Sequence, residues 1–192
     1  MTFHHTFDTP GGVECPYACW DGLFTVAELD DLEAIAAGAR GATTVGDASG
    51  WRQDDQVRRS RVSWVVGETW LYDRLAPVIA ELNARHWGLD LTGFGEAFQA
   101  TRDEASEDGH YDWHQDYGAV VSRKLSMVIQ LTDPALYEGG DLEIMTGPVP
   151  MAVQKLRGRV VLFPSYQLHR VTPVTSGTRH SLVAWLSGPR FR

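Results

Sequence analysis

The chain has 192 residues, of which 43% are hydrophobic and 22% charged, an ordinary composition for one globular domain with a real core. Its net charge of −8 argues against nucleic acid as a partner, because binding to a phosphate backbone needs a basic surface. No apolar run is long enough to cross a bilayer, and residues 1–8 lack the basic and apolar regions of a secretory signal. We therefore expect a cytoplasmic protein that does not bind membranes, with Cys15 and Cys19 as reduced thiols.

The first predicted helix follows residues 25–28, which have the form of a capping box. Its apolar positions recur at helical spacing at Leu29, Leu32, Ile35 and Ala36. We expect this helix to end near Gly38 or Gly41. The polar stretch 42–56 indicates a loop.

Alternation over residues 57–66 predicts a strand with Val62, Trp64 and Val66 on one face. Thr69 is expected to cap a second helix that runs to about His86. The apolar stripe of this helix comprises Leu71, Leu75, Ile79 and Leu82.

Short strands and turns dominate the remaining chain. Residues 94–101 predict a strand, and the acidic, small residues 103–109 predict a loop. The later strands are expected at 111–116, 124–131, 140–146, 150–155, 159–163, 168–174 and 179–187. Helices followed by many short strands favour an α+β domain built around a β-sandwich or barrel. We expect a single domain over 1–192, with helical support at about 20–90 and a catalytic β core at about 92–188.

Three residues form a candidate metal site. His114 and Asp116 are two residues apart on an expected strand, so their side chains point to the same side, and His169 can join them from a distant strand. Two imidazoles and one carboxylate leave one face of a metal open, as in non-heme Fe(II) oxygenases, although zinc also accepts such ligands. Arg179 precedes an apolar stretch and is expected to be buried, where it needs an anionic partner such as the carboxylate of a co-substrate.

Several segments resemble the 2-oxoglutarate/Fe(II) oxygenases, in particular their prolyl 4-hydroxylase-like branch. The resemblance covers roughly residues 57–188, and its motifs are residues 109–116, 123–126, 130–134, 137–142, 158–165, His169, 171–179 and Trp185. It implies a double-stranded β-helix (jelly roll) with the N-terminal helices packed on one sheet. It also implies that His114, Asp116 and His169 bind Fe(II), that Arg179 binds 2-oxoglutarate, and that O2 is consumed, with ascorbate as an optional reductant.

Other residues are expected around these ligands. Ser181 shares a face with Arg179, and Ser126 and Gln130 share a face of another strand, so these three are candidates for co-substrate binding. Many relatives place a hydroxyl near the position of Gln130, so the second contact to 2-oxoglutarate stays open. Tyr111 and Trp185 are expected to line the substrate pocket.

The implied activity is hydroxylation of an unactivated C–H bond in a small molecule, amino acid or short peptide, with release of succinate and CO2. One alternative is a peptidyl-prolyl hydroxylase that acts on a protein, and another is a cupin-like metal-dependent isomerase or hydrolase. The carboxylates of residues 103–108 precede the metal strand. They either attract a cationic substrate to the pocket mouth or form a solvated surface loop.

Overall fold

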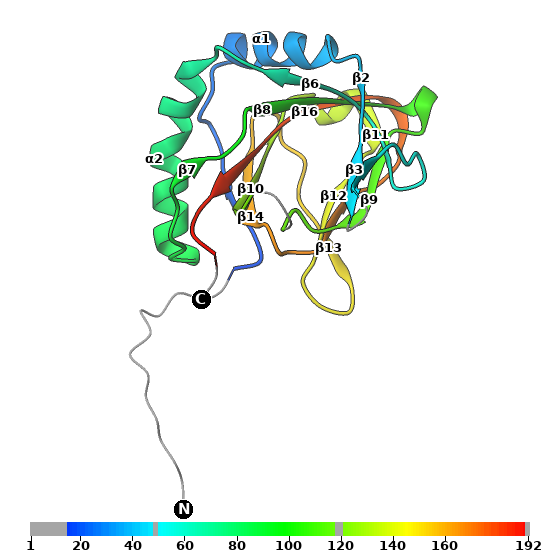
Figure 1. Ribbon diagram of the computed structural model, residues 1–192. Coiled ribbons are helices and arrows are strands. Elements are labelled where there is room, and N and C mark those ends of the chain that lie inside the picture. Colours follow the sequence, from blue (N-terminus) through cyan, green and yellow to red (C-terminus); the bar gives the residue numbers. More distant parts are fainter. Residues whose placement is uncertain (1–14, 48–49, 118–120, 191–192) are drawn as a thin grey trace, which may run out of the picture.

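The computed structural model describes residues 15–47, 50–117 and 121–190 (Figure 1). Two antiparallel sheets face each other, and helices α1 (Val26–Ala37) and α2 (Thr69–His86) lie on the outer side of the larger sheet. This is the double-stranded β-helix arrangement predicted from the sequence, and the sheets do not close into a barrel. The segment 1–8, for which we expected no secretory signal, lies outside the described residues.

The larger sheet carries the long strands of the chain. In spatial order it comprises β1 (Ala18–Trp20), β14 (Val160–Pro164), β10 (Arg123–Gln130), β16 (Val174–Ser187), β8 (Phe98–Glu104), β6 (Arg61–Val65) and β2 (Gly41–Ala42). Two short strands, β7 (Gly93–Phe94) and β11 (Tyr137–Gly139), also pair with β16.

The smaller sheet comprises β13 (Pro150–Ala152), β12 (Leu142–Met145), β15 (His169–Val171), β9 (His110–His114) and β5 (Arg58–Arg59). A separate hairpin pairs β3 (Val45–Asp47) with β4 (Gly50–Arg52). Two 3-10 turns, η1 (Ala105–Glu107) and η2 (Pro134–Leu136), connect strands.

The two faces of the larger sheet have different environments, because side chains alternate along a strand. On β10, the outward residues Leu125, Met127 and Ile129 are fully buried in the core beneath the helices. The alternate residues Ser126, Val128 and Gln130 point into the space between the sheets, where Val128 packs with apolar residues of β12 and β14. The helices thus stabilise the sheet from one side and leave the other side for a site.

Both predicted helices are present, with one difference in their caps. Thr25 and Glu28 form the expected capping box, and α1 ends at Gly38. In α2 the predicted apolar stripe is buried, but Thr69 is the first helical residue rather than the cap. Glu68 takes the cap position without a side-chain hydrogen bond to the helix, so α2 is stabilised by packing more than by capping.

Several predicted boundaries were wrong. The stretch 42–56 contains the β3–β4 hairpin, and the single strand predicted at 57–66 is two strands, β5 and β6, which belong to different sheets. Asp103 and Glu104 lie in β8 rather than in a loop. The helical N-terminal region also contributes strands, because β1 pairs with β14 in the larger sheet.

Two further observations concern membrane association and the cysteines. Among the described residues, no helix is both long and apolar enough to span a membrane. Cys15 and Cys19 form no disulfide in the part of the chain that the structure describes.

Candidate metal centre

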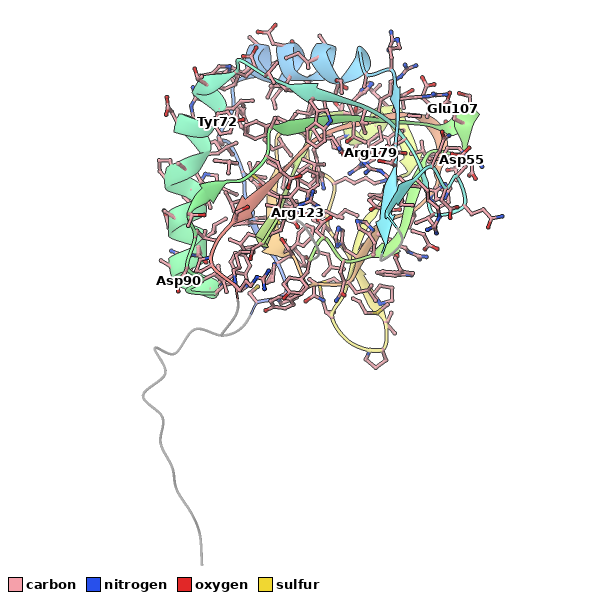
Figure 2. All side chains as sticks on the ribbon, viewed as in Figure 1. Asp55, Tyr72, Asp90, Glu107, Arg123 and Arg179 are labelled. Atoms are coloured by element: carbon pink, nitrogen blue, oxygen red, sulfur yellow. The ribbon has the colours of Figure 1, made fainter. Side chains whose placement is uncertain are left out.

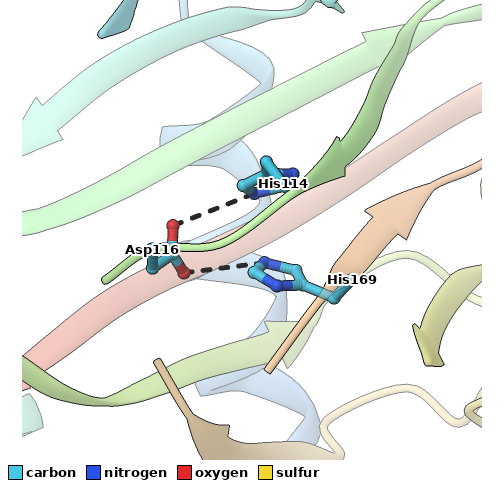
Figure 3. Close-up of side chains that lie close together, drawn as sticks. All are labelled: His114, Asp116 and His169. Atoms are coloured by element: carbon cyan, nitrogen blue, oxygen red, sulfur yellow. Dashed lines mark ion pairs between the residues drawn. The ribbon is translucent and has the colours of Figure 1, made fainter. Parts of the chain in front are cut away.

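His114, Asp116 and His169 converge between the two sheets (Figure 3). The Nε2 atom of His114 lies 3.8 Å from Oδ1 of Asp116, and that of His169 lies 3.6 Å from Oδ2. One potential ligand atom from each residue lies within 4.8 Å of the other two. His114 and His169 are direct partners across β9 and β15, so the antiparallel pairing itself places the two imidazoles side by side.

The backbone orients both imidazoles for metal binding. The Nδ1 atom of His114 lies 2.7 Å from the carbonyl oxygen of Asp112, and that of His169 lies 2.9 Å from that of Gln167. A carbonyl only accepts, so each Nδ1 carries the proton and each Nε2 keeps its lone pair free for a metal. Burial, and next the neighbouring His169, lower the pKa of His114 from 6.5 to about 3. His114 is therefore a neutral ligand at pH 7.

Asp116 lies in a bend just after β9, rather than on the strand as the spacing had suggested. Ser126 of β10 donates a hydrogen bond of 2.6 Å to its Oδ2 atom, and the hydroxyl groups of Ser126 and Ser165 are 3.0 Å apart. Burial would raise the pKa of Asp116, but the two histidines, the Ser126 hydrogen bond and Arg123 together lower it to about 2. The carboxylate is thus ionised and oriented by the larger sheet.

Aromatic rings support both histidines. Tyr111 stacks on His114 with the ring centroids 3.4 Å apart and the planes 12° apart. Phe163 meets His169 edge to face at 4.6 Å. These contacts restrict rotation of the imidazoles and exclude water from their faces.

Arg179 lies in the middle of β16, which begins at Val174 rather than at residue 179 as predicted. It is buried, with 4% of its surface exposed, and its Nη1 atom donates to Oδ2 of Asp103 at 2.8 Å and to Ser181 at 3.3 Å. A guanidinium has five donors, so Asp103 leaves most of them available. A Cβ on Gly140 would lie 2.8 Å from Cδ of Arg179, so this glycine makes room for the arginine.

The structure separates the predicted co-substrate residues into three environments. Ser181 contacts Arg179, whereas Ser126 contacts Asp116 of the triad. The side-chain oxygen of Gln130 accepts a hydrogen bond from the backbone of Leu156 and so anchors the segment before β14. Thr101, which the sequence reading missed, is paired with Ser181 across β8 and β16, and its buried hydroxyl has no partner among the described residues.

The predicted pocket residues face the same interior. Trp185 is buried, its Nε1 atom has no partner among the described residues, and Arg123 lies 3.9 Å above its ring. Arg123 also binds Glu96 at 2.6 Å and lies 3.8 Å from Asp116. Arg123 was not singled out from the sequence, because strict alternation would place it on the same outward face as Leu125. The register of β10 shifts between Arg123 and Leu125, and Arg123 instead faces the interior.

The carboxylates of residues 103–108 do not form a free acidic surface. Each is paired with an arginine: Asp103 with Arg179, Glu104 with Arg102, Glu107 with Arg61 and Asp108 with Arg59. Figure 2 shows Arg179 between the sheets and Glu107 at the rim of the molecule. The segment therefore gives no support to a cationic substrate.

Two histidines and one carboxylate between the sheets of a double-stranded β-helix match the donor set of the non-heme iron oxygenases. Residues 98–187, which carry the site, match the family model of the 2OG-Fe(II) oxygenase superfamily, and this match confirms the resemblance predicted from the sequence. A PKHD-type hydroxylase of Synechococcus sp. strain CC9311 is 39% identical over 85 residues. This match covers 43% of the present chain and 39% of the relative, so the chain spans about two fifths of that protein's length.

Solved structures show the same fold. A prolyl-4-hydroxylase of Pseudomonas putida has a TM-score of 0.70 at 17% identity, with 91% of this chain and 94% of that chain covered. A prolyl hydroxylase of Trichoplax adhaerens, in complex with a peptide fragment of the hypoxia inducible factor, has a TM-score of 0.71 at 15% identity and covers 90% of this chain and 84% of that chain. The fold of this chain thus resembles that of prolyl hydroxylases, as the sequence predicted.

Proposed function

We propose that this protein is a 2-oxoglutarate- and Fe(II)-dependent dioxygenase that hydroxylates an unactivated C–H bond of a small molecule, amino acid or short peptide. The observation that carries the proposal is the orientation of His114 and His169. Both Nδ1 atoms are tied to backbone carbonyls, and both Nε2 atoms face the ionised Asp116. The superfamily match favours this reading over a cupin-like isomerase or hydrolase.

The donor set fits iron. His114, Asp116 and His169 would hold Fe(II) on one face, and the bound metal with 2-oxoglutarate and O2 supplies the oxidising chemistry, with succinate and CO2 as by-products. Ser126 keeps Asp116 in place, while Tyr111 and Phe163 keep the imidazoles in place. Such support for metal ligands is a general requirement, because a misoriented ligand loses metal affinity.

Arg179 would bind the distal carboxylate of 2-oxoglutarate together with the hydroxyls of Ser181 and Thr101. These two hydroxyls face each other across β8 and β16, and that of Thr101 is buried without a partner among the described residues. A planar guanidinium with free donors matches a carboxylate well. Asp103 would share Arg179 with the co-substrate, so the negative charge of Asp103 should weaken the binding of 2-oxoglutarate.

The triad is tested by three single substitutions, His114→Ala, Asp116→Ala and His169→Ala. Each variant should lose Fe(II) binding in anaerobic calorimetry and lose succinate formation, yet keep its circular dichroism spectrum, since the larger apolar cluster lies on the other side of the sheet. His86→Ala, at the end of α2, is the matched control and should behave as wild type. Full iron-dependent succinate formation in all three triad variants would show that the proposal is wrong.

A further inference from the structure

The side chain of Arg58 reaches from the smaller sheet to the larger one. It lies on β5, where it pairs with Tyr111 of β9. Its Nη2 atom donates to the side-chain oxygen of Gln99 on β8 at 2.8 Å. Its guanidinium carbon lies 4.4 Å from the centroid of the Tyr111 ring. Arg58 therefore belongs to the interior of the site, although it comes from an edge strand.

Arg58 differs from the other two arginines of this interior in its partners. Arg123 is paired with Glu96 at 2.6 Å and Arg179 with Asp103 at 2.8 Å. Among the side chains that the structure describes, no carboxylate forms an ion pair with Arg58, and its Nε atom is buried without a hydrogen-bond partner. An arginine cannot lose its proton in a protein, and a half-buried charge without an ion-pair partner is costly. Such a residue is expected to have an anionic partner that is absent from the chain itself.

The position of Arg58 relates this missing partner to the metal centre. The Tyr111 ring, over which Arg58 lies, is stacked on His114 at a centroid distance of 3.4 Å. One aromatic ring thus separates Arg58 from a metal ligand. A substrate whose anionic group bound Arg58 would therefore be held next to the Tyr111 ring that contacts His114.

We propose that Arg58 binds a carboxylate of the substrate, so that the enzyme acts on small carboxylic acids such as an amino acid or the C-terminal residue of a short peptide. The proposal rests on the proposed function, because it assigns a substrate class to the same site. It predicts an anionic rather than a cationic substrate. It also separates the roles of two arginines, with Arg179 binding the co-substrate and Arg58 binding the substrate.

The test measures binding rather than turnover. Anaerobic protein loaded with Fe(II) and 2-oxoglutarate is titrated calorimetrically with three probes, N-acetylglycine, N-acetylproline and N-acetylleucine, and with the amide of each. In the wild type, at least one carboxylate should bind ten times or more tightly than its own amide, because a guanidinium binds a carboxylate through charge-assisted hydrogen bonds. Arg58→Gln should abolish this preference, and Arg58→Lys should restore part of it.

Three controls make the result specific. Arg59→Gln removes the neighbouring arginine of β5, which is paired with Asp108 near the surface, and should leave the preference intact. Arg58→Gln should bind 2-oxoglutarate as tightly as the wild type, whereas Arg179→Gln should bind it more weakly. Circular dichroism should show that all variants are folded.

Two results would overturn the proposal. If no carboxylate binds better than its amide in the wild type, Arg58 does not select an acid. If Arg58→Gln weakens the binding of 2-oxoglutarate tenfold or more, Arg58 holds the co-substrate instead. Neither result would contradict the proposed function, because iron binding by the triad and binding of 2-oxoglutarate are measured in titrations of their own.

Discussion

Ser126→Ala tests whether this hydroxyl acts on the metal site or on the co-substrate. The sequence placed Ser126 among the co-substrate residues, but its hydroxyl donates to Asp116 at 2.6 Å. A hydrogen bond to a charged group contributes about 1.5–3 kcal/mol, which corresponds to roughly ten- to a hundred-fold in affinity. Loss of a group that orients a metal ligand typically costs about ten- to a hundred-fold in metal affinity. The two estimates agree, so we expect Fe(II) affinity to fall by that factor.

Anaerobic calorimetry with Fe(II) measures the metal affinity, and a second titration at saturating metal measures the affinity for 2-oxoglutarate. The second value should be unchanged in Ser126→Ala. Ser165→Ala is the matched control, because it removes the other hydroxyl of this buried pair and keeps the contact to Asp116. Wild-type metal affinity combined with weaker 2-oxoglutarate binding in Ser126→Ala would refute the reasoning and return Ser126 to the co-substrate site.

Four other changes have defined outcomes. Asp103→Asn should keep a hydrogen bond to Arg179 but remove a competing negative charge, so calorimetry should show that 2-oxoglutarate binds about tenfold or more tightly. Weaker binding would contradict the proposal that Arg179 binds the distal carboxylate of 2-oxoglutarate. Arg179→Lys should weaken that binding roughly ten- to a hundred-fold with unchanged metal affinity, because the bidentate fork is lost. Gly177→Ala would bring a Cβ into clash with the carbonyl oxygen of Leu136 at a backbone φ of +73°, so urea denaturation should show a loss of about 1–3 kcal/mol or more. A hydrogen bond from the backbone N–H of Thr25, and next one from Arg74 of α2, lower the pKa of Glu28 below 4.5. The stability that this carboxylate contributes is therefore complete above about pH 4.5 and is lost as the pH falls through the pKa of the folded state. Glu28→Gln should make the unfolding free energy depend less steeply on pH in this range.

The elements that could be predicted from the sequence are those whose signals are local. The capping box at Thr25 and the apolar stripe of α2 depend on residues three and four apart, and both are present. The approximate positions of most strands after residue 110 could also be predicted, because they are short strand-like segments separated by turns. The triad could be predicted because its three ligands lie in recognisable motifs.

The features that the sequence did not reveal depend on contacts between distant segments. Residues 57–66 were predicted to form one strand. The chain instead leaves the smaller sheet at Ser60 and joins the larger one, because β5 pairs with β9 and β6 pairs with β8. Asp103 was taken as part of a surface loop because its neighbours are acidic, but its partner Arg179 lies 76 residues further along the chain. Arg58 was not predicted as a site residue for the same reason, because its contact with Tyr111 depends on the pairing of β5 with β9.

The alternation along β10 has a practical consequence for protein engineering. Alternate residues of this strand serve different requirements. Met127 and Ile129 stabilise the helix-covered core, whereas Ser126 contacts Asp116 and Val128 packs between the sheets. A library that varies only the inward positions of β10 and β16 should therefore yield many folded members. Selection for a new substrate could then proceed with little of the loss of foldability that usually limits the redesign of an enzyme interior.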